Sequence, residues 1–583
     1  MLRRRRLRSI LRPGLRLLLV LSIGALLATP LAVSWAITRT QVEDTIGVSP
    51  TTFSLTTSGH SELRLGIAGT VFVPRSRGPL GVVATVEGPT AVAAGPDDGG
   101  GDLASYVTPQ MLTLYSGLFH DPEPAVHGYI DVLEAEFFHE LIVSELFLTL
   151  VVGGALLIVL LLLPPRRPAP RRRQARWAGA LLVGLVATST VALWQVDGAG
   201  RTRAASGVYA LPALDGTAAA GSTTNSPVLR LVLGDAVPKV QTLVRRQEAR
   251  ARAFRDTANQ SLAASRALMA GPREGETAML LQSDMHCNQT MILLQAQVRR
   301  ILSTEYGGDV PALLAVTGDL TTNGTAAERT CIESEAAIAG GAPVAAVTGN
   351  HESDLSAGQM RAAGMTVLDG STRSLAGVDI LGDGDPERTE LFGATRLRGR
   401  ETEADVGRRL YATASRDKPQ VVLVHEAYAA QAFLGVSDMT EFLDRRGAPT
   451  EPIEDDDVRD LPAAAVFYGH WHRSILPRVV WNSDGTWTLV MELDTSGGAV
   501  DTPTIGHFST PWTPPRQEAS FPVVFLDDRT HLVTGYQLYS FRVDGSVSVL
   551  PRVEVGDRNL LSSPLPDRVE SVGTPPSQEG PRS

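Results

Sequence analysis

The chain has 583 residues, of which 43% are hydrophobic and 20% are charged, and this balance excludes a disordered or collagen-like protein. Its two cysteines exclude a fold that depends on a disulfide framework. The net charge of −10 conceals an uneven distribution, because 13 arginines lie in residues 1–16 and 164–176. Without them, 40 basic residues stand against 63 acidic ones, a net charge of −23. General nucleic-acid binding is therefore not expected.

Three apolar runs, at residues 17–37, 146–163 and 177–196, carry no charged side chain. Each is long enough to cross the ~30 Å hydrocarbon layer of a bilayer as a helix. The first run exceeds the roughly 7–15 residues of the apolar core of a cleaved signal peptide. It therefore predicts a retained signal anchor, with a cleaved signal as the alternative.

Arginine-rich segments indicate the cytoplasmic side of a membrane protein, because short basic loops stay there. The basic N-terminus, residues 1–16, and the basic loop 164–176 are therefore expected inside. The three spans then place residues 38–142, and everything after about residue 197, outside the cytoplasm. We expect a multi-pass protein of the cell membrane that contacts the lipid bilayer through three helices.

Residues 38–142 are expected to form a small extracytoplasmic domain, with strands up to about residue 100 and a more helical part after it. No catalytic constellation is present in this segment. Four histidines there lack partners at metal-ligand spacing: His60, His120, His127 and His139. The segment is expected to bind a partner in the cell envelope, which the sequence does not identify.

Residues 197–275 combine a linker of small residues with an amphipathic helix that is predicted from about Asp235 to Ala267. This helix either packs on the domain that follows or holds that domain away from the membrane, and packing is the favoured interpretation. Residues 557–583 are rich in Pro, Ser and Glu and are expected to be a disordered tail.

Five apolar, strand-like segments after Glu276 each end in side chains that bind metals. Only five of the 11 histidines lie between residues 140 and 506, and all five are in these segments. Ligands of open α/β sheets bind at the carboxyl ends of the strands, so we expect the five ends to form one site. In chain order they carry Asp284 with His286, Asp319, Asn350 with His351 and Glu352, His425, and His470 with His472.

The order D-x-H, G-D-x-x-x-x-G, G-N-H-E, a lone His after a strand and G-H-x-H resembles the calcineurin-like metallophosphoesterases. The resemblance extends from Glu276 to about Gly498. It implies an α/β fold, a four-layer α/β/β/α sandwich over residues 276–556, in a membrane-anchored bacterial member of the family. The β-rich segments beyond His472 resemble the second sheet of that sandwich.

The resemblance also implies two divalent metal ions. Mn, Fe and Zn all suit a ligand set of imidazoles, carboxylates and an amide oxygen. The family pattern assigns one metal to Asp284, His286 and His472, the other to Asn350, His425 and His470, and a bridging role to Asp319.

His351 matches the catalytic histidine of the family, which contacts the phosphate and protonates the leaving oxygen. Glu352 follows directly, and its carboxylate is expected to orient that imidazole, with an ordinary surface acid as the alternative. A tight turn at residues 496–498 is expected to approach the phosphate through its backbone. His507 and Phe508 are expected to border the substrate pocket.

Cys287 follows the predicted ligand His286, and Cys331 lies in the helix expected after the Asp319 loop. A Cys287–Cys331 disulfide is one expectation for a domain outside the cytoplasm. Two buried free thiols are the alternative. Neither cysteine is expected to bind metal, because the family pattern already fills the site.

The expected function is hydrolysis of a phosphomonoester or phosphodiester outside the cytoplasm by a membrane-anchored metalloenzyme. Two alternatives stay open: a metal-binding module without turnover that serves envelope assembly, and a nuclease that acts on extracellular nucleic acid. The presence of His351 disfavours the first alternative, and the acidic balance of the chain disfavours the second.

Overall fold

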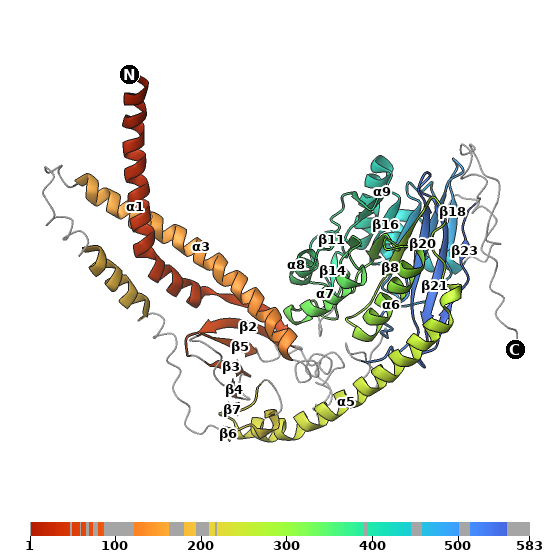
Figure 1. Cartoon of the computed structure of the whole chain (residues 1–583), viewed down its shortest axis with the longest axis horizontal. Coiled ribbons are helices and arrows are strands. Elements are labelled where there is room, and N and C mark those ends of the chain that lie inside the picture. Colours follow the sequence, from red (N-terminus) through yellow and green to blue (C-terminus); the bar gives the residue numbers. More distant parts are fainter. Residues whose placement is uncertain are drawn as a thin grey trace, which may run out of the picture. The chain divides into compact units, whose positions relative to one another are not determined.

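The computed structural model describes residues 2–46, 49–58, 60–65, 69–73, 80–86, 122–162, 180–193, 209–215, 219–389, 395–444, 458–500 and 513–556. The chain divides into two compact units, and each is described by itself (Figure 1). The first comprises residues 1–96 and 126–239, and the second comprises residues 97–125 and 240–583.

Two helices of the first unit are long and apolar enough to cross a membrane. Helix α1 (Leu2–Arg39) contains the candidate span Leu17–Arg39, and α3 (Pro122–Leu162) contains the candidate span Gly128–Ile158. The third predicted span appears, in its described part, as the shorter apolar helix Ala180–Leu193. Two of the three predicted spans therefore lie in helices of sufficient length and apolarity, whereas the described part of the third falls short of the necessary length.

Small side chains allow α1 and α3 to approach each other closely. A Cβ atom added at Gly24 would lie 3.0 Å from the Cα of Gly153, so a larger residue would force the helices apart. Ala28 and Ala32, one and two turns further along, are fully buried and pack with Leu148. Helices in membranes associate through such contacts, because lipid tails provide no hydrophobic drive for packing.

A sheet completes the first unit, in the strand order β1-β2-β5-β3-β4-β7-β6. The strands predicted within residues 38–100 are thereby confirmed, while residues 87–121 lie outside the described residues. The last two strands come from beyond the helix Ala180–Leu193, and Val71 of β4 pairs with Thr224 of β7. The bounds are β1 (Gln41–Ile46), β2 (Ser49–Thr56), β3 (Ser61–Arg64), β4 (Thr70–Val73), β5 (Gly81–Val86), β6 (Tyr209–Ala210) and β7 (Thr223–Thr224).

The second unit contains a sheet in the order β11-β10-β9-β8-β20-β21-β22, with β23 paired to β21. Strands β8 to β11 run parallel, and β20 joins them by pairing antiparallel with β8. The bounds are β8 (Glu276–Gln282), β9 (Leu313–Val316), β10 (Val344–Ala346), β11 (Thr366–Val367), β20 (Ala519–Asp527), β21 (Val533–Phe541), β22 (Val547–Val549) and β23 (Val553–Glu554).

A second sheet of this unit has the order β12-β13-β16-β17-β19-β18. The segments after His472 were expected to form one sheet, and here the structure differs. Strands β18 and β19 join this second sheet, but β20 to β23 extend the first, because β20 aligns with β8. The bounds are β12 (Arg373–Leu375), β13 (Val378–Gly382), β16 (Val421–Leu423), β17 (Ala465–Tyr468), β18 (Arg478–Trp481) and β19 (Trp487–Glu492).

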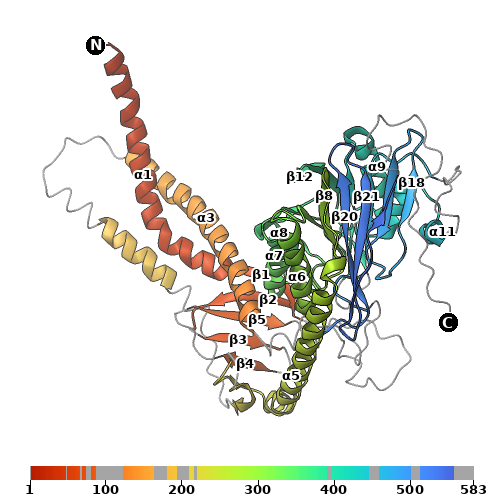
Figure 2. The same ribbon diagram turned by 45° about the vertical axis from the view of Figure 1, so that its right-hand side comes forward.

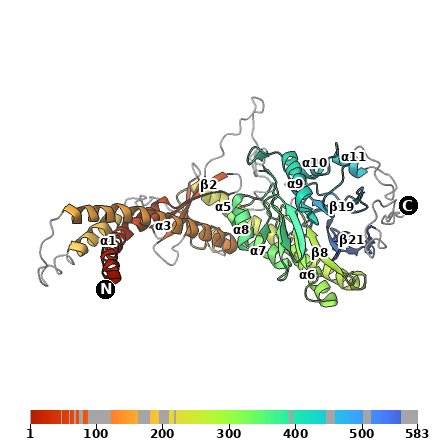
Figure 3. The same ribbon diagram turned by 90° about the horizontal axis from the view of Figure 1, so that it is seen from above.

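Three hydrophobic clusters among the described residues hold this unit together. One packs the first sheet against α5 to α8, which lie on one side of β8, β20 and β21 (Figure 2). A second joins the two sheets, with Leu281 of β8 and Leu423 of β16 among its members. The third packs the second sheet against α9 to α11, and Figure 3 shows α9 beside α10. The bounds are α5 (Pro227–Ala264), α6 (Gln289–Tyr306), α7 (Arg329–Ile338), α8 (Asp354–Ala362), α9 (Glu403–Asp417), α10 (Ala427–Leu434) and α11 (Met439–Asp444).

Helix α5 is the amphipathic helix that the sequence predicted near residues 235–267. Phe254, Ala258 and Leu262 follow at four-residue intervals and are buried in the cluster on the first sheet. The Ser261 hydroxyl donates to the carbonyl of Val547 at 3.2 Å and accepts from its N–H at 2.9 Å. The C-terminal half of α5 therefore packs on the folded domain, as favoured.

Candidate metal centre

The predicted ligands follow the carboxyl ends of five buried strands. Strands β8, β9 and β10 of the first sheet precede Asp284, Asp319 and Asn350, and β16 and β17 of the second precede His425 and His470. Several ligands lie in sharp turns with left-handed backbone, which L-residues rarely adopt: Asp284, His286, Asp319, His470 and His472. Such strain persists where the surrounding structure enforces it, and it concentrates at functional sites.

One group of metal-binding atoms comes from Asp284, His286 and His472, whose ligand atoms lie within 4.8 Å of one another. Nε2 of His472 is 3.2 Å from Oδ1 of Asp284 and 3.3 Å from Nε2 of His286. The N–H of His470 donates to Oδ2 of Asp284 at 3.0 Å, which fixes the carboxylate. This group could hold a metal ion, and it contains the three residues assigned to one metal.

A second group comes from Asp319, His425 and His470, again within 4.8 Å of one another. Nε2 of His425 is 3.4 Å from Oδ2 of Asp319, 3.2 Å from Nδ1 of His470 and 3.1 Å from Oδ1 of Asn350. The predicted ligands of the other metal therefore also come together, and this group too could hold a metal ion.

Asp319 lies between the two groups. Its Oδ2 atom is 3.4 Å from Nε2 of His425 in the second group and 3.9 Å from Nε2 of His286 in the first. Its Oδ1 atom accepts the backbone N–H of His351 at 2.9 Å. This position is the one required of a carboxylate that bridges two cations.

The orientation of His425 tests whether these residues suit a metal. Its Nδ1 lies 2.8 Å from the carbonyl oxygen of Thr317, which only accepts, so Nδ1 carries the proton. Nε2 then points at Oδ2 of Asp319 and Oδ1 of Asn350, which are acceptors as well. Three lone-pair atoms facing one another repel unless a proton or a metal cation lies among them, so the donor set fits a metal.

His472 shows the same arrangement at the first group. Its Nδ1 lies 3.0 Å from the carbonyl oxygen of Ala499, which leaves Nε2 to face Asp284 and His286. Metal-binding histidines commonly donate their other ring N–H to a carbonyl or a carboxylate, which fixes the ring. Both rings therefore turn Nε2 toward the centre, where this nitrogen can bind a cation in place of a proton.

Sequence reasoning missed Glu426 as a functional residue. Its Oε1 atom lies 2.8 Å from Nε2 of His470, so the carboxylate holds the imidazole whose Nδ1 faces His425. The hydrogen-bond partners on Thr317 and Ala499 are backbone carbonyls, which no side-chain pattern indicates. Glu426 directly follows a ligand, and that adjacency was the available signal.

Burial is the largest single effect on Asp319 and His425 and opposes their charged forms, but the combined attraction between them and from neighbouring histidines and carboxylates outweighs it. The pKa of Asp319 therefore lies well below its ordinary value, and the pKa of His425 lies well above its ordinary value. Burial lowers the pKa of His286 to about 3, which keeps this ring neutral. A divalent cation would take the place of the proton on His425, because metal binding releases protons from its ligands.

His351 borders the centre without belonging to either metal group. Its Nδ1 lies 2.7 Å from the carbonyl oxygen of Thr322, so Nδ1 carries a proton and donates it. Nε2 then has a lone pair in the neutral ring and carries a second proton in the imidazolium form. Nε2 is 4.0 Å from Oδ2 of Asp319, and 27% of the side chain is exposed. The ring can therefore reach both the centre and an incoming molecule.

The role predicted for Glu352 is wrong. Its carboxylate is fully buried and accepts the backbone N–H groups of Asp319, Gly349 and Thr321 at 2.7–2.9 Å, together with the Thr321 hydroxyl. The ring of His351 is oriented by Thr322 instead. Although Glu352 directly follows His351 in sequence, its carboxylate points away from that ring. It connects the loop after β9 to the loop after β10.

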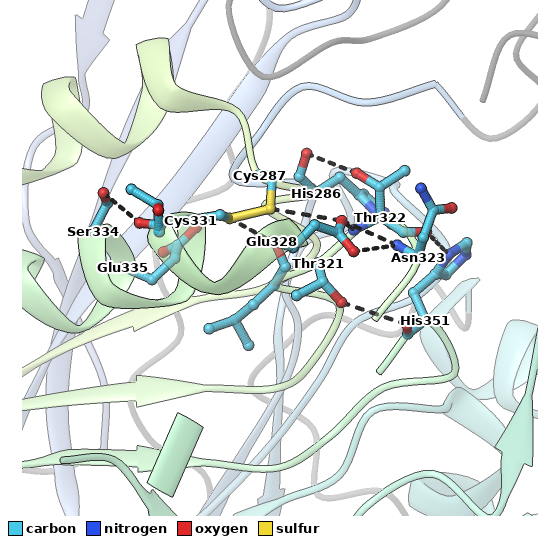
Figure 4. The surroundings of a disulfide bond; sticks show 12 residues. His286, Cys287, Thr321, Thr322, Asn323, Glu328, Cys331, Ser334, Glu335 and His351 are labelled. Atoms are coloured by element: carbon cyan, nitrogen blue, oxygen red, sulfur yellow. Dashed lines mark hydrogen bonds between the residues drawn. A yellow bond between two sulfur atoms is a disulfide. The ribbon is translucent and has the colours of Figure 1, made fainter. Parts of the chain in front are cut away.

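A disulfide joins Cys287 to Cys331, which decides against two free thiols (Figure 4). It connects the residue after His286 to helix α7, with Cα atoms 5.4 Å apart. Beside it, Oε1 of Glu328 accepts the backbone N–H groups of Thr322 at 2.7 Å and Asn323 at 3.1 Å. The loop that orients His351 is thereby fixed to the same helix terminus.

The turn at residues 496–498 packs against the Asp284 loop. The N–H of Ser496 donates to the carbonyl of Ser283 at 2.8 Å, and a Cβ atom added at Gly497 would lie 2.1 Å from the carbonyl oxygen of Met285. The backbone of this turn therefore supports the loop that carries Asp284, and its contact with phosphate stays a prediction. His507 and Phe508 lie outside the described residues.

All seven predicted metal ligands thus converge at one edge shared by the two sheets of the second unit. No protein-family model matches the chain, and a search of curated proteins finds no match. The function of the centre is therefore inferred from its chemistry.

Proposed function

We propose that the chain is a dinuclear metal-dependent phosphoesterase of the calcineurin-like type. The observation that carries the proposal is the position of Asp319, which belongs to one His/Asp group and lies close to His286 of the other, with His351 beside them. Two cations held at such a centre supply Lewis-acid stabilisation of phosphoryl oxygens and lower the pKa of a water molecule. Imidazole, carboxylate and amide donors suit Mn, Fe or Zn.

The residues of the chain itself account for the remaining steps. His351 keeps its Nδ1 proton on the carbonyl of Thr322, so a second proton is carried on Nε2; in that imidazolium form Nε2 donates to the phosphate and can pass its proton to the leaving oxygen. Glu426, Thr317 and Ala499 keep the ligand imidazoles in the required orientation. The disulfide and Glu328 keep the flanking loops in place.

The four-layer α/β/β/α sandwich belongs to the same proposal. In its favour, one hydrophobic cluster joins the two sheets, and two others pack each sheet against its own set of helices. The active centre of such a sandwich would lie where the parallel strands of both sheets end, which is where the ligands converge.

The assay that tests the proposal uses the full chain in detergent. We expect hydrolysis of bis-p-nitrophenyl phosphate or p-nitrophenyl phosphate that is abolished by a chelator and restored by Mn²⁺. The ratio of the two rates separates a phosphodiesterase from a phosphomonoesterase. Two bound metals without turnover of either ester would instead favour a binding module, and cleavage of single-stranded DNA alone would favour a nuclease.

We also propose three membrane crossings, with the centre outside the cytoplasm. Strands β4 and β7 pair in one sheet, so residues 70–73 and 223–224 lie on the same side of any membrane. If α3 crosses the bilayer, a second crossing must return the chain before β6, and the apolar helix Ala180–Leu193 lies in that interval. The disulfide in the second unit also favours an oxidising compartment.

A reporter fusion tests this topology. Alkaline phosphatase fused after residue 556 should be active, because that enzyme folds only in an oxidising compartment. The same reporter inserted in the basic loop 164–176 should be inactive. Activity in the loop, together with none after residue 556, would contradict the proposed orientation.

A further inference from the structure

A short β-hairpin covers the loop that carries Asn350 and His351. It consists of β14 (Glu387–Arg388) and β15 (Arg396–Leu397), which pair antiparallel. Thr389, directly after β14, donates its backbone N–H to the carbonyl of Asn350 at 2.9 Å. The hairpin is thereby attached to a residue of the metal centre.

The side chain of Thr389 determines which end of the Asn350 amide faces the centre. Nδ2 of Asn350 donates to Oγ1 of Thr389, and Oγ1 of Thr389 lies 3.1 Å from Oγ1 of Thr395, which directly precedes β15. With its donor end occupied, the amide presents Oδ1 to Nε2 of His425 at 3.1 Å. A cation binds the amide oxygen and is repelled by the amide N–H groups, so this orientation is the productive one.

Two arginines of the hairpin hold the backbone of the same loop. Arg388 donates to the carbonyl oxygens of Asn350 and His351, and Arg398 donates to those of Gly349 and Glu352. All four carbonyl groups of the G-N-H-E segment are therefore bound by the hairpin. A guanidinium group suits this purpose, because its donors form a rigid planar fork.

We propose that residues 387–389 and 395–398 form the positioning element of the second metal group. Thr389 is a positioning residue that turns the Asn350 oxygen toward the cation, and Arg388 and Arg398 fix the loop that carries it. This inference rests on the proposed metal centre. It follows that the affinity of the second metal group for its cation depends on the Thr389 hydroxyl, although this hydroxyl is a ligand of neither metal.

Equilibrium dialysis of the full chain against Mn²⁺ tests the inference. Wild-type protein should bind two ions, and Thr389→Val should lower the affinity for one of them about 10–100-fold, the usual loss for an outer-shell partner. Thr389→Ser keeps the hydroxyl group and should restore the wild-type affinity. Thr372→Val is the matched control, because it removes an exposed hydroxyl that bonds to Asp417 and to no residue of the metal groups, and it should leave both affinities unchanged.

The possible results separate two failures. Equal binding by wild type and Thr389→Val would overturn the inference but leave the metal centre intact. A loss in Thr389→Ser as large as in Thr389→Val, or equal losses at both ions, would also overturn it, because the hydroxyl group would not be the cause. A wild-type chain that binds no Mn²⁺ would instead contradict the proposed function.

Discussion

Replacing Asp319 by Asn should reduce both the number of tightly bound metals and the turnover of phosphoesters. The carboxylate is buried, and its Oδ2 atom lies between His286 of one metal group and His425 of the other. An amide oxygen carries no negative charge, so it cannot offset the repulsion between two cations that it bridges. We expect a loss of rate beyond the roughly 10–100-fold that is usual for an outer-shell substitution. Metal analysis of the purified variant measures the stoichiometry directly.

Asp309→Asn is the matched control, because Asp309 is exposed and lies just before the same strand. It should keep wild-type metal content and rate. An Asp319→Asn protein that still holds two metals tightly would show that this carboxylate does not bridge them.

Replacing His351 by Ala should leave both metals in place but slow the reaction about 10²-fold or more, the contribution expected of a general acid. His351 is outside both metal groups, and its Nε2 lies 4.0 Å from the bridging carboxylate. The loss should depend on the leaving group. p-Nitrophenolate departs without a proton, so its ester should suffer less than the phenyl ester.

Steady-state rates with the two esters, together with metal content, check this assignment. His139→Ala is a suitable control, since His139 is an exposed residue of α3. Equal losses for both esters would show that His351 binds the phosphate without donating a proton. Loss of metal in His351→Ala would make it a ligand.

The ligands of the centre were predictable because each follows a short apolar strand. A buried parallel strand such as Leu313–Val316 ends at the carboxyl edge of its sheet, and the polar side chains that directly follow it lie at that edge. The concentration of histidines at five such ends identified the edge. The C-terminal half of α5 was predictable for a similar reason, since its apolar residues recur with helical periodicity.

Other features depend on contacts that no local pattern records. Strand β20 pairs with β8 across more than 230 residues of sequence, so its sheet could not be assigned from composition. Glu352 was assigned to its neighbour His351, but its carboxylate binds the backbone of Asp319, which is far away in the chain. The residues of β14 and those flanking β15 contact the Asn350 loop through backbone carbonyls and one hydroxyl group, and no sequence pattern records such contacts.

The most direct test of the dinuclear centre is a titration. Full-length protein in detergent would be stripped with a chelator, dialysed, and titrated with Mn²⁺ while the hydrolysis of bis-p-nitrophenyl phosphate and p-nitrophenyl phosphate is followed. Two His/Asp groups, with Asp319 of one group close to His286 of the other, predict that turnover of at least one ester rises to a plateau at two equivalents per chain. A plateau at one equivalent, or no turnover with two ions bound, would contradict a dinuclear phosphoesterase.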